Sequence, residues 1–130
     1  MIVRLDHLVL TVADVDATAA FYERTLGMKL VTFEGERVAL VFGQQKLNLH
    51  QAGAEIEPKA YRPTPGSADL CFVTEASVEM IAAHLGAAQV SVELGPVART
   101  GARGPIWSFY FRDPDGNLVE LSTYDTYTDR

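Results

Sequence analysis

Five polar side chains that can bind a metal ion or a polar ligand interrupt short apolar stretches of this sequence: His7, Asn48, His50, Asp69 and Glu120. Glu120 lies within the run Leu118–Leu121, where a buried carboxylate without a partner would be costly, so it needs a cation or an Arg beside it. Imidazole and carboxylate groups are also the residue types that bind divalent transition metals. What these side chains can do depends on the strands that carry them.

Composition and charge narrow the class of protein. The 130 residues fit one compact domain with a formal net charge of −6. An acidic surface argues against general binding of nucleic acid or of anionic membranes, because phosphate groups need Lys and Arg. Arg4 and Asp6 interrupt any signal-peptide core, and no stretch approaches the roughly 20 apolar residues of a membrane span. With a single cysteine, Cys71, predicted to lie in the core, a soluble cytoplasmic protein is expected.

The first part of the chain predicts the order strand, helix, strand, strand, strand. A segment rich in Val and Leu at 3–12 is typical of a strand, and Asp14 or Asp16 can cap a helix that Gly27 ends. At helical spacing along it are Ala17, Ala20, Phe21, Arg24 and Leu26. Three short strands are then predicted at 29–33, 38–42 and 46–50.

The same order returns after residues 52–66, which contain three prolines and no periodicity and therefore predict a linker. A strand at 67–74 precedes a helix at 77–85, ended by Gly86. On one face of that helix lie Val78, Ile81, Ala82 and Leu85. Further strands are predicted at 90–94, 107–112 and 117–123. The prediction is an α+β domain spanning 1–130, built from two βαβββ modules at about 1–51 and 66–126.

The two modules align with each other as sequences. Residues 7–10 match 69–72, and residues 47–50 match 119–122. The extra residues of the second module fall mostly in 96–105, a segment with Gly and Arg that is predicted to be a loop. The segment 113–116, Asp-Pro-Asp-Gly, is a strong turn signal between the last two strands.

Alternation along the strands assigns the polar side chains to particular faces. If the apolar residues of each strand face the helix, then His7, Asn48, Asp69 and Glu120 occupy equivalent positions on the faces that no helix covers. His50 shares the face of Asn48, two residues further on. If the two sheets combine into one curved cup, these polar groups meet inside it.

Several motifs in the chain resemble a known family. The segments Asp6-His7-Leu8, Phe21-Tyr22 and Leu26-Gly27-Met28 resemble the first module of the vicinal-oxygen-chelate superfamily. Residues 110–121 resemble its closing hairpin and last strand, and 46–50 and 66–70 are similar to the uncharacterised glyoxalase-domain-containing proteins. The superfamily includes glyoxalase I, fosfomycin and bleomycin resistance proteins and extradiol dioxygenases. The resemblance covers nearly the whole chain and implies paired βαβββ modules and a homodimer.

The resemblance also implies a divalent metal, bound through the first and fourth strands of both modules. By position, His7 and Glu120 match the family's usual His and Glu ligands. Asp69 stands where His is most common, and Asn48 stands where glyoxalase I has its glutamate base, which argues against glyoxalase I activity in particular. His50 is a candidate imidazole ligand on the same strand. The implied ion is Fe, Mn, Ni, Co or Zn, acting as a Lewis acid, and Glu120 is the one candidate for a catalytic role.

Other residues are candidates for holding the substrate. Arg99 and Arg103 could bind an anionic group such as a carboxylate or phosphonate, although a solvated loop is an equally good interpretation. Trp107 and Tyr110 could wall the cup, although aromatic strand residues more often pack in a core. Asn48 is a further candidate contact to the substrate.

Two functions follow from these features. The leading hypothesis is a metal-dependent enzyme of isomerase, lyase or transferase type, which stabilises an enolate or alkoxide of a small oxygen-rich substrate. The alternative is a non-catalytic protein that sequesters a drug or other small molecule, as bleomycin resistance proteins do without a metal site. A ring-cleaving dioxygenase is less favoured, because those enzymes resemble a longer chain. Metal-dependent turnover, or a ligand complex that needs no metal, would separate the first two.

Overall fold

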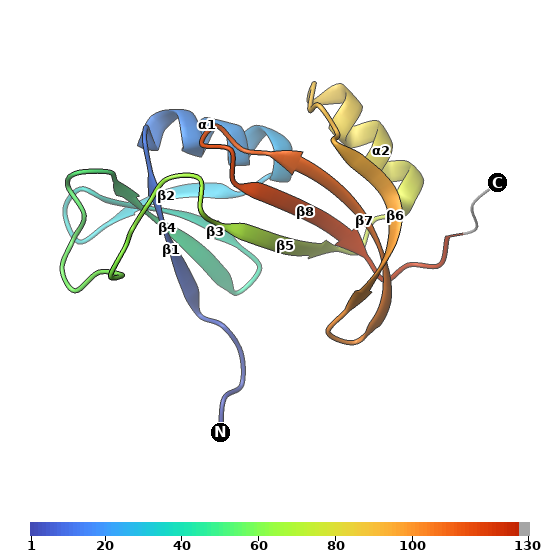
Figure 1. Cartoon of the computed structure of the whole chain (residues 1–130), viewed down its shortest axis with the longest axis horizontal. Helices are drawn as coiled ribbons and strands as arrows, with labels where there is room; N and C mark the ends of the chain where they lie inside the picture. Colours follow the sequence, from blue (N-terminus) through green and yellow to red (C-terminus); the bar gives the residue numbers. More distant parts are fainter. Residues whose placement is uncertain (128–130) are drawn as a thin grey trace. The chain divides into compact units, whose positions relative to one another are not determined.

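The computed structural model describes residues 1–127, which form two compact units. One unit contains residues 1–68 with 114–116, and the other contains 69–113 with the residues from 117 onward. Each unit has one four-stranded mixed sheet and one helix, and neither sheet closes into a barrel (Figure 1). The predicted α+β class with two βαβββ modules is confirmed.

The first module pairs its first strand with its last. Its elements are β1 (His7–Val12), α1 (Val15–Leu26), β2 (Lys29–Phe33), β3 (Arg37–Phe42) and β4 (Gln45–Gln51), and the strand order is β1-β4-β3-β2. β1 and β4 are parallel, and the other neighbours are antiparallel. β1 begins four residues later than predicted, because its partner β4 begins only at Gln45 and its last backbone contact on this side is the Lys46 N–H, which donates to the Asp6 carbonyl at 3.3 Å.

Helix α1 has the predicted ends but buries a different face. The Asp14 side chain accepts a hydrogen bond from the Ala17 N–H, and Gly27 ends the helix at φ 67°. Ala17 and Ala20, which stand at helical spacing in the sequence, are exposed. The buried residues are instead Thr18, Ala19, Tyr22 and Thr25. A threonine can be buried here because the Thr25 hydroxyl donates to the Phe21 carbonyl within the helix.

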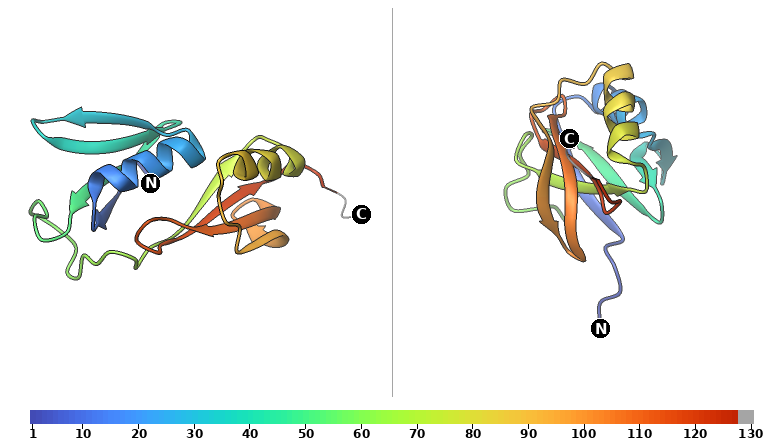
Figure 2. Two further views of the ribbon diagram at one scale, coloured as in Figure 1. Left: turned by 90° about the horizontal axis from the view of Figure 1, so that it is seen from above. Right: turned by 90° about the vertical axis from the view of Figure 1, so that its right-hand side faces the viewer.

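The second module repeats this arrangement. Its elements are β5 (Asp69–Thr74), α2 (Val78–Ala87), β6 (Leu94–Gly101), β7 (Gly104–Arg112) and β8 (Leu118–Thr123), in the order β5-β8-β7-β6. The Ser77 hydroxyl caps α2 by accepting from the Met80 N–H. Val78, Ile81 and Leu85 are buried as predicted, whereas Ala82 is exposed. The prediction that Gly86 ends the helix is wrong, because α2 continues to Ala87 and is capped by Ala88. The two views in Figure 2 show α2 lying along one side of its sheet.

The segment 96–105, predicted to be a loop, is mostly a β-hairpin. Residues 94–101 pair with 104–110, and the strand predicted at 90–94 is absent from the described chain. Gly95 and Pro96 are the reason that the sequence predicts a loop here, because both residues are uncommon inside strands. They are tolerated because β6 is an edge strand and because an irregularity in register between Leu94 and Val97 absorbs them.

The strand register confirms that the two modules are repeats. His7 pairs with Lys46 in the first sheet as Asp69 pairs with Leu118 in the second. On the helix side of both sheets lies the core, which includes Leu10, Val12, Leu40, Leu47, Phe111, Val119 and Leu121. The opposite faces carry the polar residues that the repeat predicted. Within residues 1–127, no helix has both the length and the apolar character needed to cross a membrane.

Candidate metal and ligand sites

His7 begins β1 on the helix-free face of the first sheet and is held by its neighbour. Its Nδ1 lies 2.8 Å from Oδ1 of Asp6, and this hydrogen bond is the main reason that the pKa of Asp6 is lowered. A carboxylate on one ring nitrogen fixes the orientation of an imidazole and leaves Nε2 for a ligand, as is common for metal-binding histidines. The side chain is about half exposed, so Nε2 is accessible.

Asn48 and His50 follow one another on the same face of β4, and both are buried. Among the described residues, Oδ1 of Asn48 and Nε2 of His50 have no hydrogen-bond partner. The Ile56 N–H donates to Nδ1 of His50 at 3.5 Å, which places the proton of a neutral ring on Nε2. Burial lowers the pKa of His50, and the positive charge of Arg37 lowers it further. His50 is therefore a neutral hydrogen-bond donor.

His7 and His50 cannot bind the same metal ion within one module. Their register positions on the paired strands, His7 opposite Lys46 and Thr11 opposite His50, are four residues apart, which is about 13 Å along the sheet. Metal–nitrogen bonds are only about 2 Å long. In this unit His50 does not replace Asn48 as a companion ligand of His7, and its buried Nε2 has no hydrogen-bond partner among the described residues.

Glu120 lies half-buried in the middle of β8, on the helix-free face of the second sheet. The buried Ser108 hydroxyl donates to its Oε2 at 2.6 Å, and the Ser122 hydroxyl donates at 3.3 Å. No Lys or Arg forms an ion pair with Glu120 in the described part of the chain. Hydroxyl groups thus take the place of the cation or Arg that the sequence leads one to expect beside Glu120.

Cys71 extends this polar network instead of lying in the core as predicted. Its Sγ lies 3.3 Å from the Ser122 hydroxyl, which lies 2.7 Å from that of Ser108. The residue is exposed, because its strand position places it on the helix-free face opposite Glu120. Partial burial and the nearby carboxylate raise the pKa of the thiol, so it stays protonated and is a poor nucleophile. The sequence analysis did not propose Ser108 or Ser122 as site residues. Both lie on the same face of the sheet as Glu120, Ser122 on the same strand and Ser108 on the neighbouring strand β7.

Asp69 starts β5 on the same face as Glu120 and is exposed. Asp69 pairs with Leu118, and Cys71 pairs with Glu120, so the backbone positions of Asp69 and Glu120 are offset by two residues, or about 7 Å, along the strands. His7 and Asn48 have the same offset in the first module. Among residues 1–127, His, Cys, Asp and Glu form no group of three or more that could hold a metal ion.

The predicted substrate contacts of the second module lie in three places. Arg99 and Tyr110 share the face of Glu120: Tyr110 pairs with Glu120, and Nε of Arg99 donates to the Tyr110 hydroxyl at 3.1 Å. Trp107 lies on the opposite face of β7, where its ring packs edge-on against Tyr127. Alternation alone forbids Trp107 and Tyr110 from sharing a wall. Arg103 lies in the turn of the β6–β7 hairpin.

A pocket of about 370 Å³ opens beside His50 in the first unit. Its polar lining includes His50 and Arg37, and Arg37 also pairs with Glu34 at 3.1 Å. Its apolar lining includes Val15, Val38, Leu49 and Ile56. The arrangement suits a small ligand with a hydrogen-bond acceptor at one end and an apolar body.

Comparison with known proteins identifies the family. Residues 4–121 match the family model described as the Glyoxalase/Bleomycin resistance protein/Dioxygenase superfamily. The chain is 57% identical over 121 residues to Virulence protein STM3117 of Salmonella typhimurium, covering 93% of this chain and 84% of that one. The crystal structure of that protein superimposes with a TM-score of 0.94 at 56% identity, covering 96% of this chain and 99% of that one. This chain therefore belongs to the superfamily, as its motifs predict.

Other relatives widen the comparison. A glyoxalase domain-containing protein, RDO1, of Mycosarcoma maydis is 58% identical over 120 residues, which is 92% of this chain and 68% of that protein. Lactoylglutathione lyase from Agrobacterium tumefaciens superimposes with a TM-score of 0.70 at 26% identity, over 93% of each chain. FosX of Listeria monocytogenes, a fosfomycin resistance protein solved with Mn(II), shares the fold at 21% identity, with a TM-score of 0.61 over 93% of this chain and 90% of that one.

Proposed function

We propose that this protein is a metal-dependent, glyoxalase-like enzyme of isomerase, lyase or transferase type that acts on a small oxygen-rich substrate. The observation that carries the proposal is Glu120: a half-buried carboxylate held by two serine hydroxyls, without a basic partner in the described chain. Such a group is suited to bind a cation. His7 and Glu120 are the proposed ligands, and Asp69 is a further candidate.

His7 supports the proposal independently. The hydrogen bond between Nδ1 and Asp6 presents Nε2 as the free nitrogen of an oriented ring. Imidazole and carboxylate ligands together suit Mn, Fe, Co, Ni or Zn. When bound, such an ion supplies Lewis-acid stabilisation of negative charge on substrate oxygens.

The other residues of the second sheet face have supporting roles in this proposal. Ser108 and Ser122 orient the Glu120 carboxylate through their hydroxyls. Arg99 is steadied by Tyr110, with which it makes both a hydrogen bond and a stacking contact at 5.5 Å, and it is suited to hold an anionic group of the substrate. The protein is proposed to act in the cytoplasm and as a homodimer, and the mass of the purified protein in solution checks the second point.

Elemental analysis of protein purified without a metal-binding tag tests the proposal. We expect stoichiometric metal in the wild type, its loss in His7→Ala and in Glu120→Ala, and its retention in His84→Ala, which changes an exposed histidine on α2. Adding Mn, Fe, Co, Ni or Zn to the stripped wild type should raise Tm, because an ion that binds the folded state stabilises it. Metal-free protein whose Tm responds to none of these ions would contradict the metal site.

A second candidate function, metal-independent binding of a small molecule, is favoured by the pocket beside His50. The buried donor Nε2–H and the Arg37 guanidinium offer two partners for a carboxylate, and Ile56 and Leu49 offer an apolar surface. Benzoate titrated into metal-free protein, with a chelator present, probes this function. Saturable binding that is lost in both His50→Gln and Arg37→Gln, together with absence of metal from the purified protein, would favour a binder over an enzyme.

A further inference from the structure

The end of the second sheet carries a set of charged residues that the proposed metal site does not use. β5 and β8 are parallel and finish in register, Thr74 opposite Thr123. Both threonines turn the chain in the same way: the hydroxyl of Thr74 accepts from the Ala76 N–H at 3.2 Å, and that of Thr123 accepts from the Asp125 N–H at 3.0 Å. These turns place Glu75 and Asp125 directly after the carboxyl ends of the neighbouring strands β5 and β8.

The turn of the β6–β7 hairpin lies at the same end of the sheet and is held there by Tyr124. The Arg103 N–H donates to the Tyr124 hydroxyl at 3.0 Å, and the Arg103 guanidinium lies over the Tyr124 ring at 4.7 Å. Gly101 makes this approach possible, since a Cβ at that position would lie 2.5 Å from the same hydroxyl. The position of Arg103 is therefore set by a backbone bond as well as by stacking.

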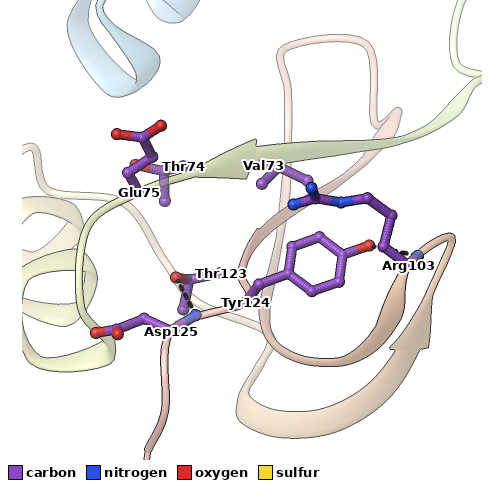
Figure 3. Close-up of a pocket in the computed structure, with 7 residues that line it drawn as sticks. All are labelled: Val73, Thr74, Glu75, Arg103, Thr123, Tyr124 and Asp125. Carbon is purple, nitrogen blue, oxygen red and sulfur yellow. Dashed lines mark hydrogen bonds between the residues drawn. The ribbon is translucent and has the colours of Figure 1, made fainter.

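Between these segments lies a pocket of about 240 Å³ (Figure 3). Figure 3 shows the Arg103 guanidinium on one side of the pocket and the side chains of Glu75 and Asp125 on the other, with their two carboxylates apart from each other. In the described part of the chain, none of these three charged groups forms an ion pair. Val73, which is 57% exposed, adds a small apolar surface to the lining.

We propose that this pocket binds a small zwitterion that carries both a primary ammonium group and a carboxylate. The guanidinium of Arg103 would receive the carboxylate, and one of the two carboxylates on the other side, Glu75 or Asp125, would receive the ammonium group through a charge-assisted hydrogen bond. The pocket separates the positive charge of Arg103 from the negative charges of Glu75 and Asp125, so these groups do not pair with one another. A single ligand that carries both charges can pair with both sides of the pocket. The pocket shares no residue with His7, Asp69 or Glu120, so its occupation does not depend on a metal.

The probe is 4-aminobutyrate, and butyrate and butylamine serve as singly charged ligands of equal length. We would titrate each into the full-length, ¹⁵N-labelled protein and follow the backbone amides of Arg103, Tyr124 and Asp125. 4-Aminobutyrate is expected to shift these amides saturably. Each control should bind at least about tenfold more weakly, because it lacks one charge-assisted contact.

Three variants locate the site. Arg103→Gln removes the charge and keeps the backbone bond to Tyr124, and the double variant Glu75→Gln with Asp125→Asn removes the other wall. Each of these two variants should weaken the binding of 4-aminobutyrate by about tenfold or more. The matched control is Arg62→Gln, which removes an arginine that lies over Tyr61 in the first unit as Arg103 lies over Tyr124. It should bind the probe as the wild type does.

The outcomes separate the proposal from its competitors. Equal binding of butyrate and 4-aminobutyrate would show an anion site and overturn the zwitterion proposal, as would a response that survives both pocket variants or no saturable shift at all. The two sides of the pocket are tested by separate variants, so if one variant misfolds, the other still tests the proposal. Circular dichroism checks that each variant is folded. His7→Ala should bind the probe normally, so failure of the metal site and failure of this pocket are distinguishable.

Discussion

The hydroxyl of Ser108 lies 2.6 Å from Oε2 of Glu120, and the serine that makes this contact is completely buried. A short bond from a buried donor fixes the carboxylate more firmly than an exposed bond would, because the donor has no water to turn to. Ser108 is therefore a positioning residue for the proposed ligand, acting through Glu120 and not on the substrate.

Ser108→Ala should weaken metal binding by about 10- to 100-fold, the range seen when a group that orients a metal ligand is removed. The Ser122 bond at 3.3 Å remains, so binding should be reduced and not abolished. Metal affinity measured by competition with a chelator checks this, with Ser91→Ala, at an exposed position, as the control. Equal affinities in the two variants would exclude a role for Ser108.

Asp6→Asn should also weaken metal binding, by about tenfold or more, because it removes the negative partner that orients His7. The pKa of Asp6 is lowered by that same hydrogen bond, so the carboxylate stays ionised as the pH falls and the pairing is lost only below the usual range of an aspartate. Isothermal titration with the metal found in the wild type measures the effect. Asp16→Asn, at an exposed position on α1, should bind as the wild type does.

His50 should make the stability of the protein depend on pH on the acidic side of neutrality. Its pKa is lowered by burial and by Arg37, so between that pKa and the usual value near 6.5 the unfolded chain binds the proton and the folded chain does not. The free energy of unfolding should therefore fall as the pH drops below about 6.5, with no contribution from His50 above it. Urea unfolding between pH 5 and 8 measures this slope. His50→Gln should flatten it, and His84→Gln should leave it unchanged.

Two glycines of the second module should respond in opposite ways to alanine. At Gly95, where φ is 140°, a Cβ would lie 2.7 Å from the Ser108 carbonyl oxygen and 2.8 Å from Cα of Phe109, and backbone cannot yield easily. Gly95→Ala should cost at least about 2 kcal/mol of stability. Gly86 lies in α2 with open space around it, so Gly86→Ala should gain about 0.5–1 kcal/mol. Urea midpoints compare them, and destabilisation by both would contradict this account.

The fold could be predicted where local pattern and repetition agree. Alternation within short strands assigned Asn48 and Glu120 to the helix-free faces, and the observed pairings of His7 with Lys46 and of Asp69 with Leu118 confirm the internal alignment. The ends of α1 follow from Asp14 and Gly27, because capping is a property of neighbouring residues.

Features that depend on a partner strand could not be predicted in this way. Residues 3–6 have strand-like composition, but β4 meets only the last of them, through the Lys46 N–H and the Asp6 carbonyl. The reverse holds for 94–101, where Gly95 and Pro96 indicate a loop, and pairing with β7 overrides them. At the candidate site, Arg99 lies opposite Ile106 and meets Tyr110 only because its long side chain reaches along the shared face of the sheet. Ser108 could not be singled out from the sequence, because its contact with Glu120 depends on the pairing of β7 with β8.

In the second module, the edge strand β6 and the hairpin turn can change length, whereas the strands β5 and β8 cannot. Asp69 and Glu120 belong to the parallel pair of β5 and β8, whereas the extra residues of this module lie at the other edge of the sheet, in an edge strand with an irregular register. Insertions and deletions in β6 or in the turn at 102–103 can therefore accumulate without moving either carboxylate, as long as Ser108 on β7 stays in register with β8. Such changes would alter the surroundings of Arg99 and Arg103, the proposed ligand contacts, while Asp69 and Glu120 stay in place.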